Sequence, residues 1–237
     1  MPEADCSPAG CARSTMALRV DLYNVEKKSG GNAVTGGKIM ERDHLIITIG
    51  CEYGAGGPQI GKMLSQKLGI EYYDRDLVDK VVDELGVDRG LVEKADQETG
   101  VQYSFETSLG PRYANLTNRV IYTQSMVIHK MAEKSSCVII GRSANFLLKD
   151  RDDVLNFFIY APKDVRVRSI MEQKKVSEEE AKQIIDYNDE MNHSRHKYIT
   201  GTYRGDRTQR DLLIDSSRLG WDKTTKYLLM YIEMLNE

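Results

Sequence analysis

A glycine-rich turn between a strand-like segment and a helix-like segment places the strongest constraint on the fold of this chain. Residues 45–49 are aliphatic or β-branched throughout, as expected of a strand buried on both faces. Gly54, Gly56 and Gly57 follow, and an amphipathic segment comes directly after them. The backbone N–H groups of such a turn converge at the positive end of the helix, which makes an anion site of phosphate size. We therefore predict a phosphate-binding strand–loop–helix over residues 45–62.

The rest of the chain alternates between strand-like and helix-like segments, which indicates an α/β fold. Further strands are expected at residues 70–73, 137–140, 154–160 and 212–214, and helices at residues 76–85, 118–134, 177–198 and 224–235. Strands that alternate with helices form a mostly parallel sheet with right-handed crossovers. With the glycine-rich turn after the first strand, this order predicts a three-layer P-loop NTPase fold around a mostly parallel five-stranded sheet.

Residues 1–40 differ in composition from the remainder of the chain. They contain prolines and a glycine-rich patch, with little apolar periodicity. This composition predicts a disordered or weakly ordered tail. Alternatively, Met40 is the true start of the protein. Residues 41–237 are expected to form one domain, in which the polar, turn-rich residues 96–118 form a mobile insert.

Charge, hydropathy and cysteine spacing argue against several classes of protein. The formal net charge is −3, whereas a dedicated nucleic-acid binder usually carries a basic surface. No apolar run approaches the length of a membrane span, and the N-terminus lacks the apolar core of a signal peptide. The cysteines have no disulfide-framework or metal-ligand spacing, and Cys137 is expected to be a small buried residue. We therefore expect a cytoplasmic protein without nucleic-acid or membrane partners.

The glycine-rich turn departs from the Walker A pattern. Aligned on Gly56, that pattern places its first glycine at Cys51 and its lysine at Gly57. Pro58-Gln59 stand where a magnesium-binding hydroxyl is expected. A second frame over residues 56–63 has glycine and lysine at Walker spacing, but it begins too far from the strand end and also lacks the hydroxyl. The remaining alternative is a strand–helix turn that binds nothing.

Six motifs after the tail carry a resemblance to a known family. They are Ile47-Thr48-Ile49, Glu52–Gly57, Gly61-Lys62, Tyr72–Arg75, Gly141-Arg142 and Ile159–Pro162. In these motifs, over about residues 44–236, the chain resembles the cytidylate kinase-like family, an atypical branch of the nucleoside-monophosphate kinases. Glycine in the lysine position is typical of this branch. Cys51 departs from it, because the position before the glutamate is commonly arginine.

The resemblance implies a kinase that uses ATP and Mg²⁺ and phosphorylates a nucleoside monophosphate such as CMP or dCMP. It also implies a helical acceptor-binding insert at about residues 74–118 and a lid at about residues 188–210. The residues that it assigns to the ATP phosphates are Gly54, Ala55, Gly56, Gly57, Lys62, Arg204 and Arg207. Those that it assigns to the acceptor are Asp74, Arg75, Arg142 and Asp189.

Arg142 is the first candidate for a catalytic arginine. It follows the predicted strand 137–140, where its guanidinium is well placed to form a bidentate contact with a monophosphate. A similar Gly-Arg-Asp follows that strand in cytidylate kinases, so the resemblance implies acceptor binding. Ser143 replaces the aspartate here. The alternative for Arg142 is an ion pair at the edge of the sheet.

The lid region supplies the second candidate, Arg195. Asp189, Asn192 and Arg195 fall at the spacing of an Asp-x-x-Asp-x-x-Arg lid motif, with asparagine for the second aspartate. The cations of this region are Arg195, Lys197, Arg204, Arg207 and Arg210. A lid of this kind closes over the ATP phosphates and expels water, and its charges can stand in for the missing loop lysine. The alternative is a solvated helix end followed by a loop.

Three polar groups have structural alternatives as strong as their functional ones. Asp74 and Arg75 end the second strand, but Asp74 can instead cap the helix that begins near residue 76. Residues 215–217 end the last strand and resemble a segment near the nucleotide in cytidylate kinases, but they can equally cap the next helix. His193 and His196 lie three residues apart, and without further metal ligands we expect them to be exposed to solvent.

Three functions remain open at this point. The leading one is ATP-dependent phosphorylation of a nucleoside monophosphate by direct in-line transfer. The second is a nucleotide-binding regulator or sensor that has lost turnover, which the absent lysine and hydroxyl favour. The third is a kinase for another small acceptor. The sequence leaves the oligomeric state open.

Overall fold

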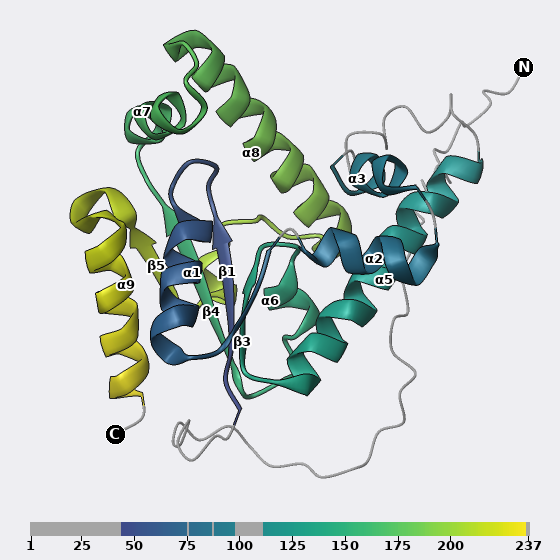
Figure 1. Cartoon of the computed structure of the whole chain (residues 1–237), viewed down its shortest axis with the longest axis horizontal. Helices are drawn as coiled ribbons and strands as arrows, with labels where there is room; N and C mark the ends of the chain where they lie inside the picture. Colours follow the sequence, from purple (N-terminus) through teal and green to yellow (C-terminus); the bar gives the residue numbers. More distant parts are fainter. Residues whose placement is uncertain (1–43, 75, 87, 98–110, 236–237) are drawn as a thin grey trace, which may run out of the picture. The chain divides into compact units, whose positions relative to one another are not determined.

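The computed structural model describes residues 44–74, 76–86, 88–97 and 111–235, and it contains one five-stranded sheet (Figure 1). The strands are β1 (Ile46–Cys51), β2 (Glu71–Tyr73), β3 (Cys137–Ile140), β4 (Val154–Tyr160) and β5 (Leu212–Asp215). Their order is β2-β3-β1-β4-β5, and every neighbouring pair is parallel. The predicted five-stranded sheet is therefore confirmed, and its central strand is the one that leads into the glycine-rich turn.

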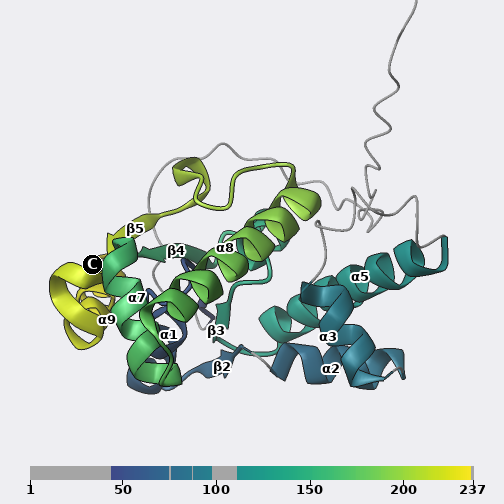
Figure 2. The ribbon, with the colours of Figure 1, turned by 90° about the horizontal axis from the view of Figure 1, so that it is seen from above.

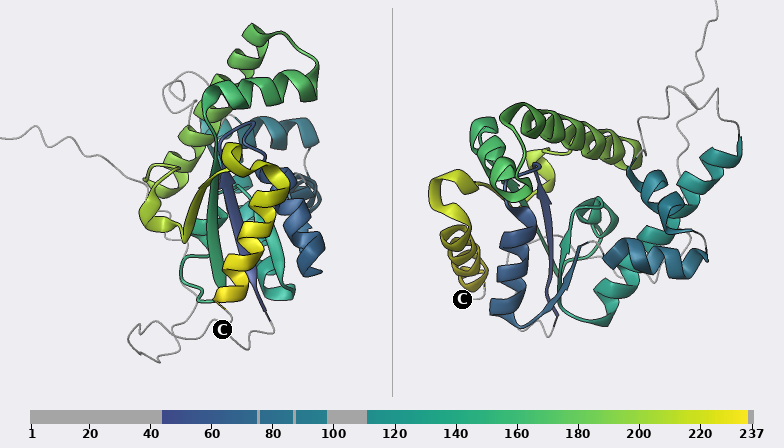
Figure 3. Two further views of the ribbon diagram at one scale, coloured as in Figure 1. Left: turned by 90° about the vertical axis from the view of Figure 1, so that its left-hand side faces the viewer. Right: turned by 45° about the horizontal axis from the view of Figure 1, so that its top comes forward.

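Helices cover both faces of the sheet. One face carries α1 (Gly57–Leu68) and α9 (Ser216–Met234), and the other carries α5 (Pro111–Lys134) and α6 (Ala144–Leu147) (Figures 1 and 3). Successive side chains of a strand point to opposite faces, so each strand serves two cores. Ile47 and Ile49 pack under α1 and α9, whereas Ile46 packs under α5. The result is the three-layer arrangement expected from the sequence.

The other helices lie around the carboxyl ends of the strands. They are α2 (Asp76–Leu85), α3 (Arg89–Gln97), α7 (Lys163–Lys174) and α8 (Glu178–Thr200), and a 3-10 turn at Arg207–Gln209 leads into the amino end of β5. Helices α2 and α3 pack on α5, and α8 runs from α7 towards α3 and α5 (Figure 2). No helix of the described ranges is both long enough and apolar enough to cross a membrane.

The differences from the predicted elements have identifiable causes. Helix α5 begins at Pro111 rather than 118, and α9 begins at Ser216 rather than 224, with a break at Gly220 (φ 71°, ψ 170°). The sequence did not predict α3, α6 or α7. Helix α7 buries Arg166 beside Val167, and a buried arginine obscures the apolar pattern that identifies a helix. The tail and residues 98–110 of the predicted insert lie outside the described residues.

Candidate functional site

The phosphate loop, residues Cys51–Gly57, joins β1 to α1. Gly54 and Gly56 have φ angles of 85° and 87°, a left-handed conformation that glycine adopts without a steric penalty. Gly56 is the N-cap of α1 and provides no side-chain cap, and Pro58 in the first turn has no N–H to satisfy. The start of α1 therefore directs backbone N–H groups and the positive end of the helix dipole at the space above β1.

The packing of the phosphate loop explains why lysine is absent from position 57. A Cβ atom at Gly57 would lie 2.6 Å from the Cβ of Cys51, and closer still to its sulfur. A Walker lysine would therefore overlap the side chain of Cys51. A Cβ at Gly56 would overlap the indole ring of Trp221, which comes from α9. Close neighbours thus require glycine at both positions, and the left-handed backbone requires it at Gly56 as well.

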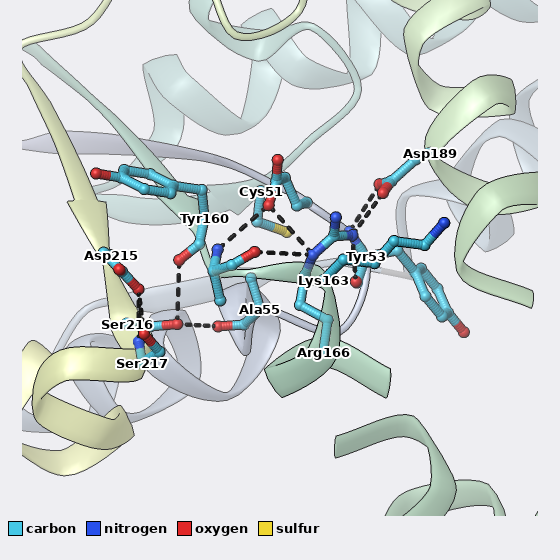
Figure 4. A network of polar contacts seen from close by, with 12 residues as sticks. Cys51, Tyr53, Ala55, Tyr160, Lys163, Arg166, Asp189, Asp215, Ser216 and Ser217 are labelled. Carbon is cyan, nitrogen blue, oxygen red and sulfur yellow. Dashed lines mark hydrogen bonds and ion pairs between the residues drawn. The ribbon is translucent and has the colours of Figure 1, made fainter. Parts of the chain in front are cut away.

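Arg166 of α7 lies below the phosphate loop and contacts it directly (Figure 4). Its side chain is only 9% exposed, and its Nη1 donates a hydrogen bond to the carbonyl of Tyr53 at 3.1 Å. The same nitrogen is paired with Asp189 Oδ2 at 2.5 Å. Its Nε donates to the carbonyl of Ala161 at 3.0 Å and lies 3.2 Å from Glu52 Oε2. Arg166 thus fixes the main chain of the loop from within the protein.

Sequence reasoning missed Arg166. The one signal available was an arginine in a segment that follows a buried strand and has few apolar residues, and that pattern is more often exposed than buried. The bond from Arg166 to the carbonyl of Tyr53 joins residues 113 positions apart in the sequence. No local pattern identifies such a pair.

Asp189 of α8, assigned to the acceptor by resemblance, lies under the phosphate loop. Its Oδ1 accepts a hydrogen bond from the backbone N–H of Tyr53 at 2.9 Å, and its Oδ2 faces Arg166. Arg204 Nη1 is 3.7 Å from Asp189 Oδ1. The carboxylate therefore joins two arginines to the loop backbone.

The segment after β5 contacts the phosphate loop from the side of α9 (Figure 4). The hydroxyl of Ser216 donates to the carbonyl of Ala55 at 2.7 Å and lies 3.3 Å from the carbonyl of Tyr160. Asp215 is the N-cap of α9, because its side chain accepts from the N–H of Ser217 at 2.9 Å. Of the two roles left open for this segment, Asp215 takes the helix cap, and Ser216 lies against the loop.

Two arginines of the return segment, residues 201–211 between α8 and β5, lie beside the phosphate loop. Arg204 Nη2 donates to the carbonyl of Cys51, and burial lowers the pKa of the Arg204 guanidinium. Arg210 lies over the ring of Phe158, 5.4 Å from its centroid, and Nη2 of Arg210 donates to the carbonyl of Arg204 at 3.2 Å. Burial, and then the charge of Arg204, lower the pKa of Arg210 to about 10.

This pair of partly buried cations is incompletely satisfied by the described part of the protein. Nε and Nη1 of Arg210 are buried and have no hydrogen-bond partner among the described residues. Two guanidinium groups this close repel each other unless an anion compensates them. The other predicted phosphate-binding cations, Lys62 on α1 and Arg207 in the 3-10 turn, are exposed to solvent.

The left-handed turn, residues Gly141–Ser143, follows β3 next to the phosphate loop. The φ angles of Gly141, Arg142 and Ser143 are 67°, 53° and 55°. For Arg142 and Ser143 this conformation costs about 1–2 kcal/mol each. Arg142 follows β3, as the sequence predicts, and the N–H of Gly141 donates to the carbonyl of Ile49 at 2.9 Å, so the turn lies beside the end of β1. Arg142 itself is half-buried.

His196 is buried, and the prediction that it is exposed to solvent is wrong. Only 4% of the residue is exposed, because the end of α8 packs on the protein rather than projecting from it. Its Nδ1 lies 3.0 Å from Ser143 Oγ and its Nε2 lies 3.3 Å from Thr202 Oγ1. Burial, together with the charges of Arg210 and Arg204, lowers the pKa of His196 to about 4, so the ring is neutral at pH 7. His193 is half-buried and packs on the ring of Tyr203.

The remaining predicted site residues lie farther from the loop. Arg195 is buried and donates to the side chain of Gln124 on α5. Asp74 is half-buried, next to the hydroxyl of Tyr72, and its charge helps to raise the pKa of the Cys51 thiol, after burial as the main cause. Arg75 lies outside the described residues.

The groups around the phosphate loop fit a polyphosphate ligand. Glycine amides, the start of α1 and the Arg204–Arg210 pair all present positive charge or donors at the carboxyl end of β1. Among the described residues, no group of three or more histidine, cysteine, aspartate or glutamate side chains is arranged to hold a metal ion. Because Mg²⁺ commonly binds through substrate phosphates and water, it can reach this site with a triphosphate.

Comparisons with a family model, with known proteins and with solved structures show what this chain is similar to. Residues 46–218 match the model of the cytidylate kinase-like family. A cytidylate kinase from Methanopyrus kandleri (strain AV19) is 24% identical over 202 residues, which cover 81% of this chain and 95% of that protein. The crystal structure of an uncharacterized protein from Eubacterium ventriosum ATCC 27560 aligns with a TM-score of 0.61 and 25% identity, over 80% of this chain and 99% of that one. A shikimate kinase from Acinetobacter baumannii, in complex with shikimate, aligns with a TM-score of 0.46 and 15% identity, over 81% and 94%.

Proposed function

Because the chain belongs to the cytidylate kinase-like family, we propose that it is an ATP-dependent kinase of a nucleoside monophosphate, with CMP or dCMP as the acceptor. Membership supports a nucleotide kinase-type function on a P-loop NTPase fold. The observation that carries the proposal is the phosphate loop itself. It is a glycine cradle at the start of α1, with two partly buried arginines beside it.

The proposed reaction is direct transfer between two bound nucleotides. An oxygen of the acceptor phosphate attacks the γ-phosphorus of ATP, the bond to the β–γ bridging oxygen breaks, and ADP leaves. The amides of Gly54–Gly57 hold the ATP phosphates, and Arg142 holds the acceptor phosphate. Mg²⁺, when it is bound with ATP, neutralises charge on the phosphates. No covalent intermediate on the protein is needed.

Arg204 is the proposed replacement for cations that the phosphate loop lacks. Position 51 carries cysteine where the family commonly has arginine, and position 57 has no room for lysine. The guanidinium of Arg204 contacts the carbonyl of Cys51, so it brings a charge from the return segment to this position. Arg207 and Lys62 are proposed as weaker, solvent-exposed contributors.

The geometry constrains the roles that we propose for three further residues, Asp189, Asp74 and Arg195. Asp189 is already bonded to the loop and to Arg166, so we propose that it acts on the acceptor through the loop. Asp74, at the end of β2, is proposed to contact the acceptor directly. Arg195 has Gln124 as a partner, so a catalytic contact requires it to exchange that partner for phosphate.

A coupled ADP-release assay over nucleoside monophosphates and nucleosides tests the proposal. We expect turnover with CMP or dCMP. The only tryptophan, Trp221, lies against Gly56, so ATP binding is expected to change the intrinsic fluorescence and can be measured separately. Arg142→Gln is expected to raise the KM for the acceptor at least tenfold, as removal of a charged contact does, while the exposed Arg119→Gln is the matched control.

The second candidate function is a nucleotide-binding regulator without turnover. The overlap of Cys51 with any side chain at position 57 favours it, because the loop cannot regain its lysine without repacking. Tight ATP binding with no turnover on any acceptor would support this function and contradict the kinase. Absence of ATP binding would contradict both.

A further inference from the structure

We propose that His196 is a positioning residue: through Ser143 it holds the left-handed turn that directs Arg142 towards the acceptor. The inference rests on the proposed function, because it assigns a reason for fixing Arg142. The contact itself is independent of that function. It joins α8, in the predicted lid, to the turn that follows β3.

The side chain of Ser143 is used in an unusual way. Ser143 is the N-cap of α6, where a serine ordinarily accepts a hydrogen bond from a backbone N–H of the first helical turn. No such side-chain cap is present, and the Oγ of Ser143 instead lies 3.0 Å from Nδ1 of His196. Ser143 therefore bonds to a residue 53 positions away instead of capping the helix that follows it. This exchange indicates that the histidine contact, rather than capping, fixes the conformation of Ser143.

The left-handed turn needs such a contact. Glycine tolerates this backbone conformation, but Arg142 and Ser143 favour right-handed or extended angles. If Ser143 returned to an ordinary N-cap conformation, the peptide plane before it would rotate and Arg142 would project elsewhere. The ring of His196 opposes that change, because both it and Ser143 are buried.

His196 is itself held by the end of α8. Nε2 of its ring lies 3.3 Å from Thr202 Oγ1, and Thr200 Oγ1 donates to its carbonyl at 2.8 Å. The N–H of Thr202 donates to Thr200 Oγ1 at 3.0 Å. These bonds lie at the start of the return segment, two residues before Arg204. One short stretch of chain therefore supports Arg142 through His196 and brings Arg204 to the phosphate loop.

Replacements of His196 can separate its two ring contacts. The amide of asparagine can reach the position of Nδ1, so His196→Asn is expected to keep the bond to Ser143. The amide of glutamine reaches the position of Nε2, so His196→Gln is expected to keep only the bond to Thr202. His196→Phe removes both while filling the space, and Ser143→Ala removes the same bond from the other partner. His193→Phe, on the same helix, is the matched control.

The test measures the KM for CMP, the KM for ATP, and the rate of hydrogen exchange in the peptide that covers residues 141–148. His196→Phe and Ser143→Ala are each expected to raise the KM for CMP about tenfold, the effect of losing one buried hydrogen bond. Their KM for ATP is expected to stay within about twofold. Exchange of the peptide should accelerate in both. Their double variant should be no worse than His196→Phe alone, because the bond that Ser143→Ala removes is already lost in that variant.

The rescue pattern distinguishes positioning from general packing. His196→Asn should have a KM for CMP closer to the wild type than His196→Gln, and His193→Phe should resemble the wild type. Equal increases in KM for both substrates, or an unchanged rate of exchange at residues 141–148 in folded His196→Phe, would overturn the proposal. If the wild type phosphorylates no monophosphate, the kinase proposal fails. The hydrogen-exchange data alone then test whether His196 holds the left-handed turn.

Discussion

The phosphate loop and the left-handed turn follow neighbouring strands, yet the protein holds them in different ways. The loop uses glycine wherever its backbone is left-handed, and it is contacted from several directions, by Arg166 of α7, Asp189 of α8 and Ser216 of α9. The turn places two non-glycine residues in that conformation, and Ser143 is held by a side chain of α8. The loop is therefore held by contacts from three helices, α8 among them, whereas Ser143 of the turn is held by a side chain of α8 alone among these contacts.

The most severe test of this comparison is to replace Arg166, which makes several bonds to the phosphate loop. Arg166→Met removes the buried guanidinium that pairs with both Asp189 and Glu52 and leaves Asp189 with Arg204 at 3.7 Å, so we expect the free energy of unfolding to fall by about 3–4 kcal/mol. Urea unfolding measures this loss. Arg168→Met is the matched control, because Arg168 is 64% exposed and pairs only with Asp164 of its own helix among the described residues. Equal losses in both variants would show that Arg166 has no special role.

The left-handed turn can be tested through pH. The pKa of His196 lies near 4 in the folded protein and near 6.5 when the chain is unfolded, so the unfolded state binds the proton more readily. Its contribution to stability is complete above pH 6.5 and is lost as the pH falls towards 4, by about 3 kcal/mol. Arg210, Arg204 and His193 supply the charges that oppose protonation, after burial itself.

The measurement is the difference between the wild type and His196→Asn in free energy of unfolding across this pH range. Asparagine does not titrate, so the wild type should lose stability faster between pH 6.5 and pH 4. Carboxyl groups affect both proteins equally and cancel in the difference. Parallel curves would mean that the histidine ring takes up protons as easily in the folded state as in the unfolded state. In that case α8 does not keep the turn in its left-handed conformation.

A smaller effect tests how closely the loop is packed. Gly57→Ala places a Cβ against the side chain of Cys51, and we expect a loss of about 2 kcal/mol in the free energy of unfolding. Cys51→Gly should relieve the overlap, so the double variant is expected to be more stable than the sum of the two single changes predicts. Gly90→Ala, on α3, is the control and should be neutral or slightly stabilising. Additive losses would contradict the overlap.

The sequence predicted the parts of the site that local rules govern. Glycine spacing between a buried strand and a helix identified the phosphate loop, and the capping box at Ser177 identified the start of α8. The contacts that hold the loop were not predictable, because they join distant positions. Ser216 and Ala55, for example, are 161 residues apart. His196 was misjudged because its neighbours in the sequence are polar, whereas its burial is decided by how the end of α8 packs in the fold.

The smallest expected effect concerns Lys62, the lysine of the second Walker frame at residues 56–63. Lys62 is exposed on α1, beyond the first turn of the helix, so its charge is largely screened by solvent. We expect Lys62→Gln to weaken ATP binding by less than about threefold, as followed by the fluorescence of Trp221. Lys67→Gln, in the last turn of the same helix, is the control and should leave binding unchanged. A loss of tenfold or more that is specific to Lys62 would mean that its side chain reaches the phosphates. The second frame would then be the functional one, and the loop could not be considered complete without a cation from its own helix.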